Sequence, residues 1–251
     1  MTFTPEDVKQ VADKVSESKY LVAFTGAGIS TESGLPDYRG PDGVWTRRDQ
    51  GLPPPQSTHP MGLTEPNPGH FALFDLYRLG TLKFVISQNV DNLHSKSGIP
   101  LSKLAELHGN HSLLKCIRCD ARFSKTEMKW VNRIHGTGYR TETPKNNQPL
   151  CPTCNGRLIS SVVNFNDPMP EREMQESKLR SQRCDVMLVI GSSLSVYPAA
   201  SLPILTKESG GQIIIINEGS TELDQLVDIR IEAKSGIFLP LILDEIKKFG
   251  V

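Results

Sequence analysis

The chain has 251 residues, of which 37% are hydrophobic and 22% charged, and its 28 Lys and Arg residues equal its 28 Asp and Glu residues. This length suits one or two domains with a buried core, and the even charge balance excludes a general electrostatic affinity for nucleic acid. No apolar run approaches the length of a transmembrane helix, and the polar segment Met1 to Val15 is unlike a signal peptide, so we expect an intracellular protein of the cytoplasm or, alternatively, the nucleus.

The first two expected elements are a helix and a buried strand. Thr4 is a suitable N-cap, Pro5 favours the first turn and acidic residues follow, which predicts a helix to about Ser18. The apolar run from Tyr20 to Phe24 is short and leads directly to a glycine turn, as is typical of a buried strand.

The segment after this strand, TGAGISTESGLPDYRG over residues 25–40, is the strongest local signal. Gly26 and Gly28 permit a tight turn and a close approach to a ligand. A strand, a glycine turn and a helix start together favour an anion. The match to the dinucleotide fingerprint G-x-G-x-x-G is partial, because Thr31 takes the position of the third glycine. Taken alone, the segment leaves cofactor binding and a plain strand–turn–helix connection equally open.

The rest of the chain alternates between strand-like and helical patterns. A Gly- and Pro-rich stretch over 34–68 predicts a long irregular segment, either functional or a flexible surface insert. Polar residues from Gln88 onward follow a strand-like run directly, and ligands bind at such strand ends in α/β sheets. Because the strand-like runs are continuously apolar, we expect a parallel sheet covered by helices on both faces. The runs cover 83–87, 159–165, 185–190, 212–216 and 229–231, and the helical patterns cover 68–79, 168–183, 198–207 and 237–249.

Four of the five cysteines form two C-x2-C pairs between the apolar runs 83–87 and 159–165, which predicts a smaller lobe inserted there. Two such pairs strongly indicate structural zinc, because four thiolates fill a tetrahedral site and leave no position for water. A redox dithiol pair is the alternative. The fifth, Cys184, stands beside a strand start and is expected to be a small buried apolar residue. The expected metal ligands are Cys116, Cys119, Cys151 and Cys154.

Together and in this order, these motifs resemble those of the sirtuins, the NAD-dependent protein lysine deacylases. The matching segments are GAGIS…GLPDYRG, QNVDNLH, LHG around His108, the two cysteine pairs, GSSLSVYP and INE. The resemblance implies an α/β fold in which a Rossmann-like parallel-sheet domain (1–33, 81–111 and 159–251) carries an inserted smaller domain. That domain would combine a cofactor-binding loop and helical module (34–80) with a zinc-ribbon module (112–158).

The resemblance also implies what the matching residues do. His108 would be the general base on a ribose hydroxyl, with Asn89 and Asp91 completing the catalytic set, and an imidazole with a pKa near 6.5 suits that task. NAD would be a consumed co-substrate, and an acyl-lysine protein or peptide would bind as an added strand along Val162, Val163 and Phe165. The implied NAD-binding residues are Gly26, Ala27, Gly28, Thr31, Asp37, Tyr38, Arg39, Gln88, Asn89, Val90, Asp91, Gly191, Ser192, Ser193, Asn217, Glu218 and Ser235.

Several alternatives stay open beside this interpretation. Asn166 stands where the family often has glycine, so the acyl chain is undetermined, and mono-ADP-ribosyl transfer to protein is an alternative activity. A non-catalytic NAD or ADP-ribose sensor would keep the fold without the chemistry, but His108 and Asn89 argue against it. An ordinary dehydrogenase would require a third glycine at Thr31, and a nucleic-acid-binding zinc ribbon would require a basic surplus. Glu32 is expected to face either solvent or the ribose, and neither a membrane nor nucleic acid is an expected partner.

Overall fold

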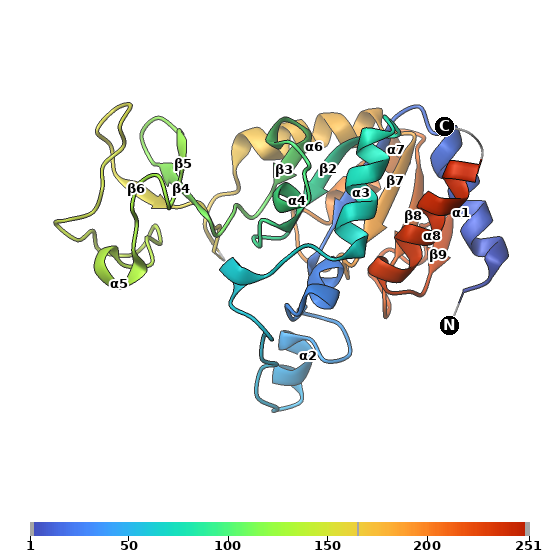
Figure 1. Ribbon diagram of the computed structural model, residues 1–251, viewed down its shortest axis with the longest axis horizontal. Helices are drawn as coiled ribbons and strands as arrows, with labels where there is room; N and C mark the ends of the chain where they lie inside the picture. Colours follow the sequence, from blue (N-terminus) through green and yellow to red (C-terminus); the bar gives the residue numbers. More distant parts are fainter. Residues whose placement is uncertain (1–2, 165, 249–251) are drawn as a thin grey trace.

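The large lobe contains a six-stranded sheet in the order β3-β2-β1-β7-β8-β9 (Figure 1). Every neighbouring pair in it is parallel, as the continuously apolar runs predicted. The computed structural model describes residues 3–164 and 166–248. Its strands in this sheet are β1 (Leu21–Thr25), β2 (Leu82–Ser87), β3 (Leu104–Glu106), β7 (Val186–Ile190), β8 (Gln212–Ile216) and β9 (Ile229–Ile231).

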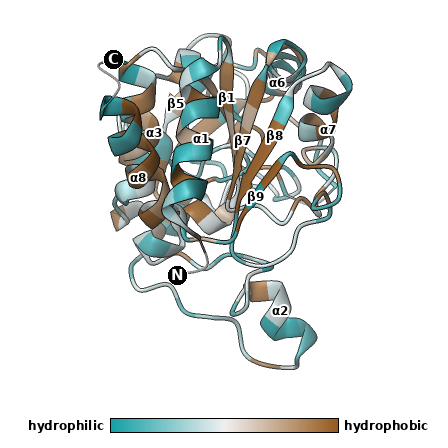
Figure 2. Ribbon diagram, turned by 90° about the vertical axis from the view of Figure 1, so that its right-hand side faces the viewer, coloured by the Kyte–Doolittle hydropathy of each residue, from teal (hydrophilic) through white to brown (hydrophobic). Residues whose placement is uncertain are grey.

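Helices cover both faces of this sheet. Figure 2 shows α1, α3 and α8 on one side and α6 and α7 on the other. Alternate residues of β1 enter the two resulting cores, with Leu21 and Ala23 in one and Val22 and Phe24 in the other. The same alternation occurs in β7 and β8, so both faces of these central strands are apolar and the strands lack polar alternation. The helices are α1 (Pro5–Glu17), α3 (Pro68–Arg78), α6 (Glu171–Arg183), α7 (Ser201–Glu208) and α8 (Ser235–Lys248). Among residues 3–164 and 166–248, none of the helices is long and apolar enough to span a bilayer.

A small lobe projects from one end of the large one (Figure 1). It contains a three-stranded antiparallel sheet in the order β5-β4-β6 and the short helix α5 (Asn132–His135). Leu114, Trp130 and Leu158 form the centre of its small core, together with cysteine side chains. The strands are β4 (Leu113–Cys116), β5 (Arg122–Ser124) and β6 (Leu158–Ser160).

One expected strand belongs to a different sheet. The apolar run 159–165 was expected to form the third strand of the main sheet, but its first residues belong to β6, where Ile159 lies opposite Lys115 of β4. The third main-sheet strand along the chain is instead β3, which contains Glu106 and pairs with β2. A short apolar run indicates burial but does not specify the strand with which it pairs.

Short helices and irregular segments connect the strands and longer helices of the large lobe. The Gly- and Pro-rich stretch contains α2, which projects below the large lobe in Figure 1, and is otherwise mostly irregular, as predicted. The glycine segment forms a 3₁₀-helix, η1, which ends where Gly34 adopts a left-handed φ of 85°. The remaining short helices are η1 (Ala27–Ser33), α2 (Val44–Asp49), η2 (Met61–Leu63), α4 (Leu93–Lys96) and η3 (Leu101–Lys103).

Candidate active site

The glycine segment lies where the strand order of the main sheet reverses. The second strand along the chain lies on one side of β1, whereas β7 lies on its other side. In parallel sheets, ligands bind beyond the carboxyl ends of the strands at such a reversal. The turns that follow the two strands are joined by hydrogen bonds from Gly26 N to Ile190 O (2.9 Å) and from Gly28 N to Gly191 O (2.8 Å).

Glycine is required for these turns to touch. A Cβ added to Gly28 would lie 2.7 Å from Gly191 Cα, and one added to Gly191 would lie 2.3 Å from Ile29 N. Gly191 also has a φ of 60°, which side-chain-bearing residues rarely adopt. Because the N–H groups of Gly26 and Gly28 are already bonded to the β7 turn, these two glycines provide close approach rather than free donors.

A narrow hollow opens at this end of the sheet. Several residues expected to bind NAD line it together, although they come from widely separated segments: Gly28, Thr31, Asp37, Gly191, Asn217, Glu218 and Ser235. Ile216, Ala233 and Lys234 line it as well. Sequence reasoning missed these three, although they end β8 or follow β9 and the strand-end rule would have found them.

A buried hydroxyl in this hollow fits a polar ligand. Ser235 is the first residue of α8, and only 4% of it is exposed. Its Oγ has no hydrogen-bond partner within the described part of the chain. An unused donor at a helix N-terminus suits a phosphate or a sugar hydroxyl, because the helix dipole also attracts negative charge there.

Asn89 and Asp91 are fixed by a buried hydrogen-bond chain. Asn89 Nδ2 donates to Gly26 O (3.0 Å) and to Ser30 Oγ (3.2 Å), and Ser30 Oγ donates to Asp91 Oδ2 (2.7 Å). The other oxygen of Asp91 accepts from Leu93 N at 2.9 Å. All three polar side chains are buried. Ser30 was not among the predicted site residues, although it stands directly before Thr31 in the same motif.

The His108 ring has one defined tautomer. Its Nδ1 lies 2.7 Å from Gln88 O. A carbonyl oxygen can only accept, so Nδ1 carries the hydrogen and Nε2 keeps a free lone pair. Burial lowers the pKa of His108 below its usual 6.5, and the bond to Gln88 O opposes part of that change. The ring is therefore neutral at pH 7 and able to accept a proton at Nε2.

The backbone around His108 is in close contact with the segment expected to bind peptide. Val163 N donates to His108 O at 2.9 Å. A Cβ on Gly109 would lie only 1.9 Å from Ser161 O, so this contact requires glycine. Val162 and Val163 are half-buried there. Phe165 lies outside the described residues.

The residues of the loop after the glycine segment lie in two different places. Asp37 lines the hollow, and burial, with a smaller effect of Asp42, raises the pKa of its carboxyl group while a bond from Gly40 N lowers it. Tyr38 and Arg39 turn away toward α2. The Tyr38 ring centroid lies 5.0 Å from that of Trp45, and the Arg39 guanidinium lies 4.9 Å from the Trp45 ring.

The remaining expected NAD-binding residues lie on the turns at this edge. Gln88 Nε2 donates to Ser192 Oγ at 2.8 Å and so connects the β2 and β7 turns. Ser193 Oγ lies 3.0 Å from Ser195 Oγ. Val90 O accepts a bond from His111 N, and Ala27 is the first residue of η1.

Glu32 is exposed, as one of the two alternatives expected, and its carboxylate also contacts α8. Its Oε2 accepts from Gly236 N at 2.6 Å, in the first turn of α8. A carboxylate there stabilises the helix by pairing with a free N–H and with the positive end of the helix dipole. Glu32 therefore connects the glycine segment to α8.

The four paired cysteines form one cluster in the small lobe. Their Sγ atoms all lie within 4.8 Å of one another, and the Cys116–Cys154 and Cys119–Cys151 pairs are 3.4 and 3.6 Å apart. Four thiolates around a tetrahedral zinc at about 2.3 Å would be separated by about 3.8 Å, which agrees with this spacing. A Cβ on Gly156 would lie 2.9 Å from Cys116 Sγ, so glycine leaves room for the cluster. The residues fit a structural zinc.

The fifth cysteine is separate from this cluster. Cys184 is buried, and its Sγ donates to Val186 O at 2.9 Å. Burial raises the pKa of its thiol to about 12, so it is not a thiolate nucleophile at neutral pH. The expectation of a small buried residue is confirmed.

Comparison with known proteins finds similarity along the chain. Residues 56–198 match the model of the Sir2 family. The NAD-dependent protein deacetylase of Caldivirga maquilingensis is 39% identical, over 96% of this chain and 95% of that protein. The NAD-dependent protein deacylase 2 of Archaeoglobus fulgidus is 34% identical, over 97% of each. A solved structure described as Sir2 with a p53 peptide and NAD⁺ is 32% identical, covers 95% of this chain and 98% of its own, and has a TM-score of 0.74.

Proposed function

Because this chain belongs to the Sir2 family, we propose that it is an NAD-dependent protein lysine deacylase. It releases nicotinamide from NAD and transfers the acyl group of a lysine side chain to ADP-ribose. The observation that carries the proposal is the hydrogen bond from His108 Nδ1 to Gln88 O. It leaves Nε2 as a neutral base at the edge of the sheet where cofactors bind.

The strand-end hollow is the proposed site for the phosphate and ribose groups of NAD. Gly28 and Gly191 allow the backbone to approach the ligand closely, and the unused Ser235 hydroxyl offers a donor. Lys234 places a positive charge on the same hollow. Asn217 and Glu218, which follow β8, are proposed to bind the adenosine ribose.

The buried chain through Ser30 is proposed to position the reacting end of the cofactor. When bound, NAD supplies a ribose carbon that loses nicotinamide and accepts the acyl oxygen. Asp91 uses both carboxylate oxygens, on Ser30 Oγ and Leu93 N, so it acts by holding Ser30 and the loop in place. Asn89 is tied to Gly26 O and therefore keeps its amide in a fixed orientation toward the glycine segment.

His108 is proposed to accept a proton from a ribose hydroxyl at Nε2. A positioned general base of this kind contributes about 10²–10⁴-fold to a rate. Its lowered pKa keeps it unprotonated at neutral pH, which a base requires. The bond to Gln88 O also prevents the ring from rotating, so the lone pair has one direction.

The acyl-lysine peptide is proposed to bind along Val162 and Val163, through main-chain hydrogen bonds that read little sequence. Because Val163 N is bonded to His108 O, the peptide segment and the base are held at a fixed separation.

The proposed domain boundaries remain those expected from the sequence, except that β6 extends the zinc module to Ser160.

The proposal is tested by incubating the protein with NAD and acetyl-, myristoyl- or succinyl-lysine peptides, followed by mass spectrometry. We expect free lysine and acylated ADP-ribose in stoichiometric amounts with at least one peptide. A His108→Ala variant should lose at least 10²-fold in rate, whereas His59→Ala, at an exposed position, should not. Absence of nicotinamide release with every peptide would contradict the proposal, and ADP-ribose attached to protein without deacylation would favour the transferase alternative.

A further inference from the structure

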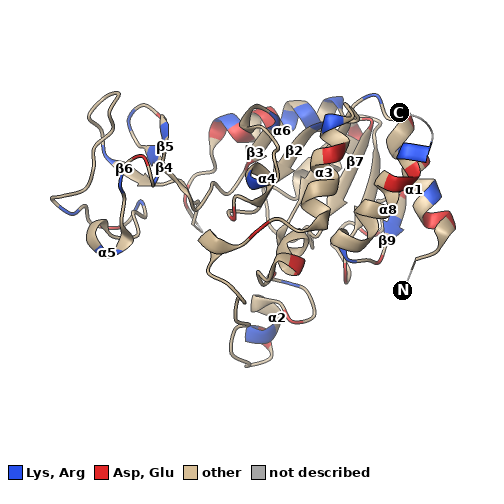
Figure 3. Cartoon of the chain, viewed as in Figure 1, with Lys and Arg blue, Asp and Glu red and all other residues tan. Residues whose placement is uncertain are grey.

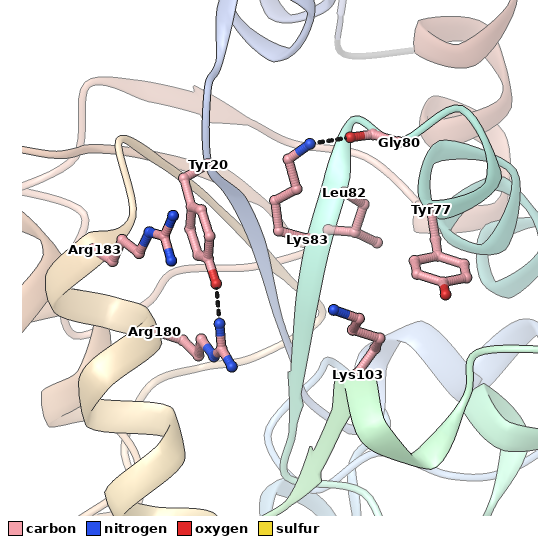
Figure 4. A pocket seen from close by; sticks show the side chains of 8 residues that line it. All are labelled: Tyr20, Tyr77, Gly80, Leu82, Lys83, Lys103, Arg180 and Arg183. Atoms are coloured by element: carbon pink, nitrogen blue, oxygen red, sulfur yellow. Dashed lines mark hydrogen bonds between the residues drawn. The ribbon is translucent and has the colours of Figure 1, made fainter.

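A second hollow lies at the opposite end of the main sheet. Its volume is about 300 Å³, and it is lined by Tyr20, Tyr77, Lys83, Lys103, Arg180 and Arg183, among others (Figure 4). Tyr20 precedes β1, Lys83 is the second residue of β2, and Lys103 directly precedes β3. These positions are the amino ends of the strands. At about 3.3 Å per residue, the length of β1 separates this hollow from the glycine segment by roughly 17 Å.

Four cations from three elements surround this volume. Arg180 and Arg183 belong to the last turn of α6, Lys83 to β2 and Lys103 to η3. Figure 3 shows basic residues toward the carboxyl end of α6, at the upper edge of the large lobe. Figure 4 shows their side chains on both sides of the hollow. The chain as a whole has no basic surplus, so this concentration of positive charge is local.

Most of these cations lack a carboxylate partner. Arg180 is paired with Glu176 and also donates to Tyr20 OH. Arg183 stacks on the Tyr20 ring at 4.3 Å, and Lys83 donates to a backbone carbonyl. The Lys103 ammonium has no hydrogen bond or ion pair within residues 3–164 and 166–248.

Neighbouring acidic groups are occupied elsewhere. Asp185 lies just beyond Arg183 in the chain but accepts bonds from Ser18 Oγ, Lys19 N and Tyr20 N. These bonds hold the carboxylate on the segment that leads into β1, outside the lining of the hollow, so the charged groups that line the hollow are all cations. The hollow retains a positive potential, and a concave surface with low-dielectric walls concentrates such a potential.

Helix ends account for only some of these cations. Positive side chains favour the carboxyl end of a helix, which explains Arg180 and Arg183 on α6, and Lys83 binds the carbonyl of Gly80 just after α3. Lys103 has no such role. It ends a three-residue turn and yet directs its ammonium toward the other cations (Figure 4). Like charges that line one hollow repel one another unless an anion lies between them.

We propose that this hollow binds a small multivalent phosphate anion, such as the polyphosphate group of a nucleotide or an inorganic polyphosphate. Arginine forks match phosphate oxygens in pairs, and lysines add point charges. The volume is at the lower end of the range for small-molecule sites and suits a short phosphate chain. The proposal is independent of the deacylase assignment, because it uses none of the residues at the glycine segment.

The test is calorimetric titration of the full chain with sodium tripolyphosphate in saturating NAD, so that the phosphate subsites of the cofactor hollow are already filled. We expect binding that weakens as sodium chloride rises from 50 to 300 mM. A Lys83→Ala/Lys103→Ala double variant should bind at least tenfold more weakly. Lys178→Ala, at an exposed position on α6 outside the hollow, is the matched control and should bind like the unmodified chain.

Further measurements test whether the variants are folded and which phosphate compound binds. Lys103→Arg keeps the charge and should retain affinity within about threefold, and thermal melts should show that all variants are folded. ATP that competes with tripolyphosphate would identify a nucleotide as the source, whereas no competition would favour inorganic polyphosphate; both support a phosphate site. No binding by the unmodified chain, or equal affinity of the double variant and Lys178→Ala, would overturn the proposal.

Discussion

A buried glutamate next to the proposed base makes the stability of this protein depend on pH. Glu106 ends β3, two residues before His108, and only 5% of it is exposed. Its Oε1 accepts from Asn110 Nδ2 at 2.7 Å, and the same nitrogen donates to Asn92 Oδ1 in the Asp91 loop. Burial raises the pKa of Glu106 from 4.5 to about 7, although the bond from Asn110 and the charge of Arg122 oppose this.

The sign of the effect follows from proton binding. The folded chain holds the proton of Glu106 more tightly than the unfolded chain, so its free energy of unfolding falls as pH rises from 4.5 to about 7. Below this window both states are protonated, and above it both are ionised. At pH 8 the raised pKa of Glu106 lowers the free energy of unfolding by about 3 kcal/mol, since a tenfold change in proton affinity corresponds to about 1.4 kcal/mol.

Replacing Glu106 with Gln removes the charge and keeps an oxygen that accepts from Asn110. The stability gain of Glu106→Gln over the unmodified chain should therefore grow by about 2 kcal/mol between pH 5 and pH 8. Urea unfolding followed by circular dichroism at both pH values measures this difference. Glu171→Gln, at an exposed position on α6, is the control and should show no such growth. An unchanged difference, or one that shrinks at pH 8, would refute the assignment of a raised pKa.

Three further predictions concern the sites. If His108 is the base, kcat/KM should hold steady as pH falls to 6.5 and decline only below it, because burial lowers the His108 pKa; a pH–rate profile that declines above 6.5 would contradict this. Gly191→Ala places a Cβ 2.3 Å from Ile29 N, which should lower the free energy of unfolding by about 1–3 kcal/mol. NAD affinity measured by calorimetry should fall at least tenfold, and unchanged binding would disprove the need for this contact. Gly156→Ala, or treatment with a chelator, should release zinc measured by atomic absorption and lower the melting temperature; a melt insensitive to both would argue against a structural metal.

The parallel sheet of the large lobe could be predicted from local patterns, because a strand that is buried on both faces is apolar at nearly every position. The run Val186–Ile190 is apolar at every position because helices cover both sides of it. The cysteine spacing likewise predicted a metal site, because each C-x2-C turn brings two thiolates together and two such turns supply the four ligands of zinc. Asn166 has a φ of 69°, the left-handed geometry that asparagine tolerates where the family often has glycine.

Other features depend on contacts between distant segments. The pairing of β1 with β7 brings Gly28 and Gly191 together, and nothing in either segment alone specifies that partner. The run 159–165 was placed in the wrong sheet for the same reason, since the antiparallel contact with β4 determines its position. Glu32 could be located only once α8 was packed beside the glycine segment.

The sequence by itself determined the long helices, five of the six strands of the main sheet and the cysteine pairs expected to bind zinc, because each depends on periodicity or on spacing within a short stretch. The tertiary structure alone decided the His108 tautomer, since that depends on a hydrogen bond to Gln88, twenty residues away in the chain. It also decided the basic hollow. Lys83, Lys103 and Arg180 belong to different elements, and their charges meet only because a parallel sheet aligns the amino ends of its strands.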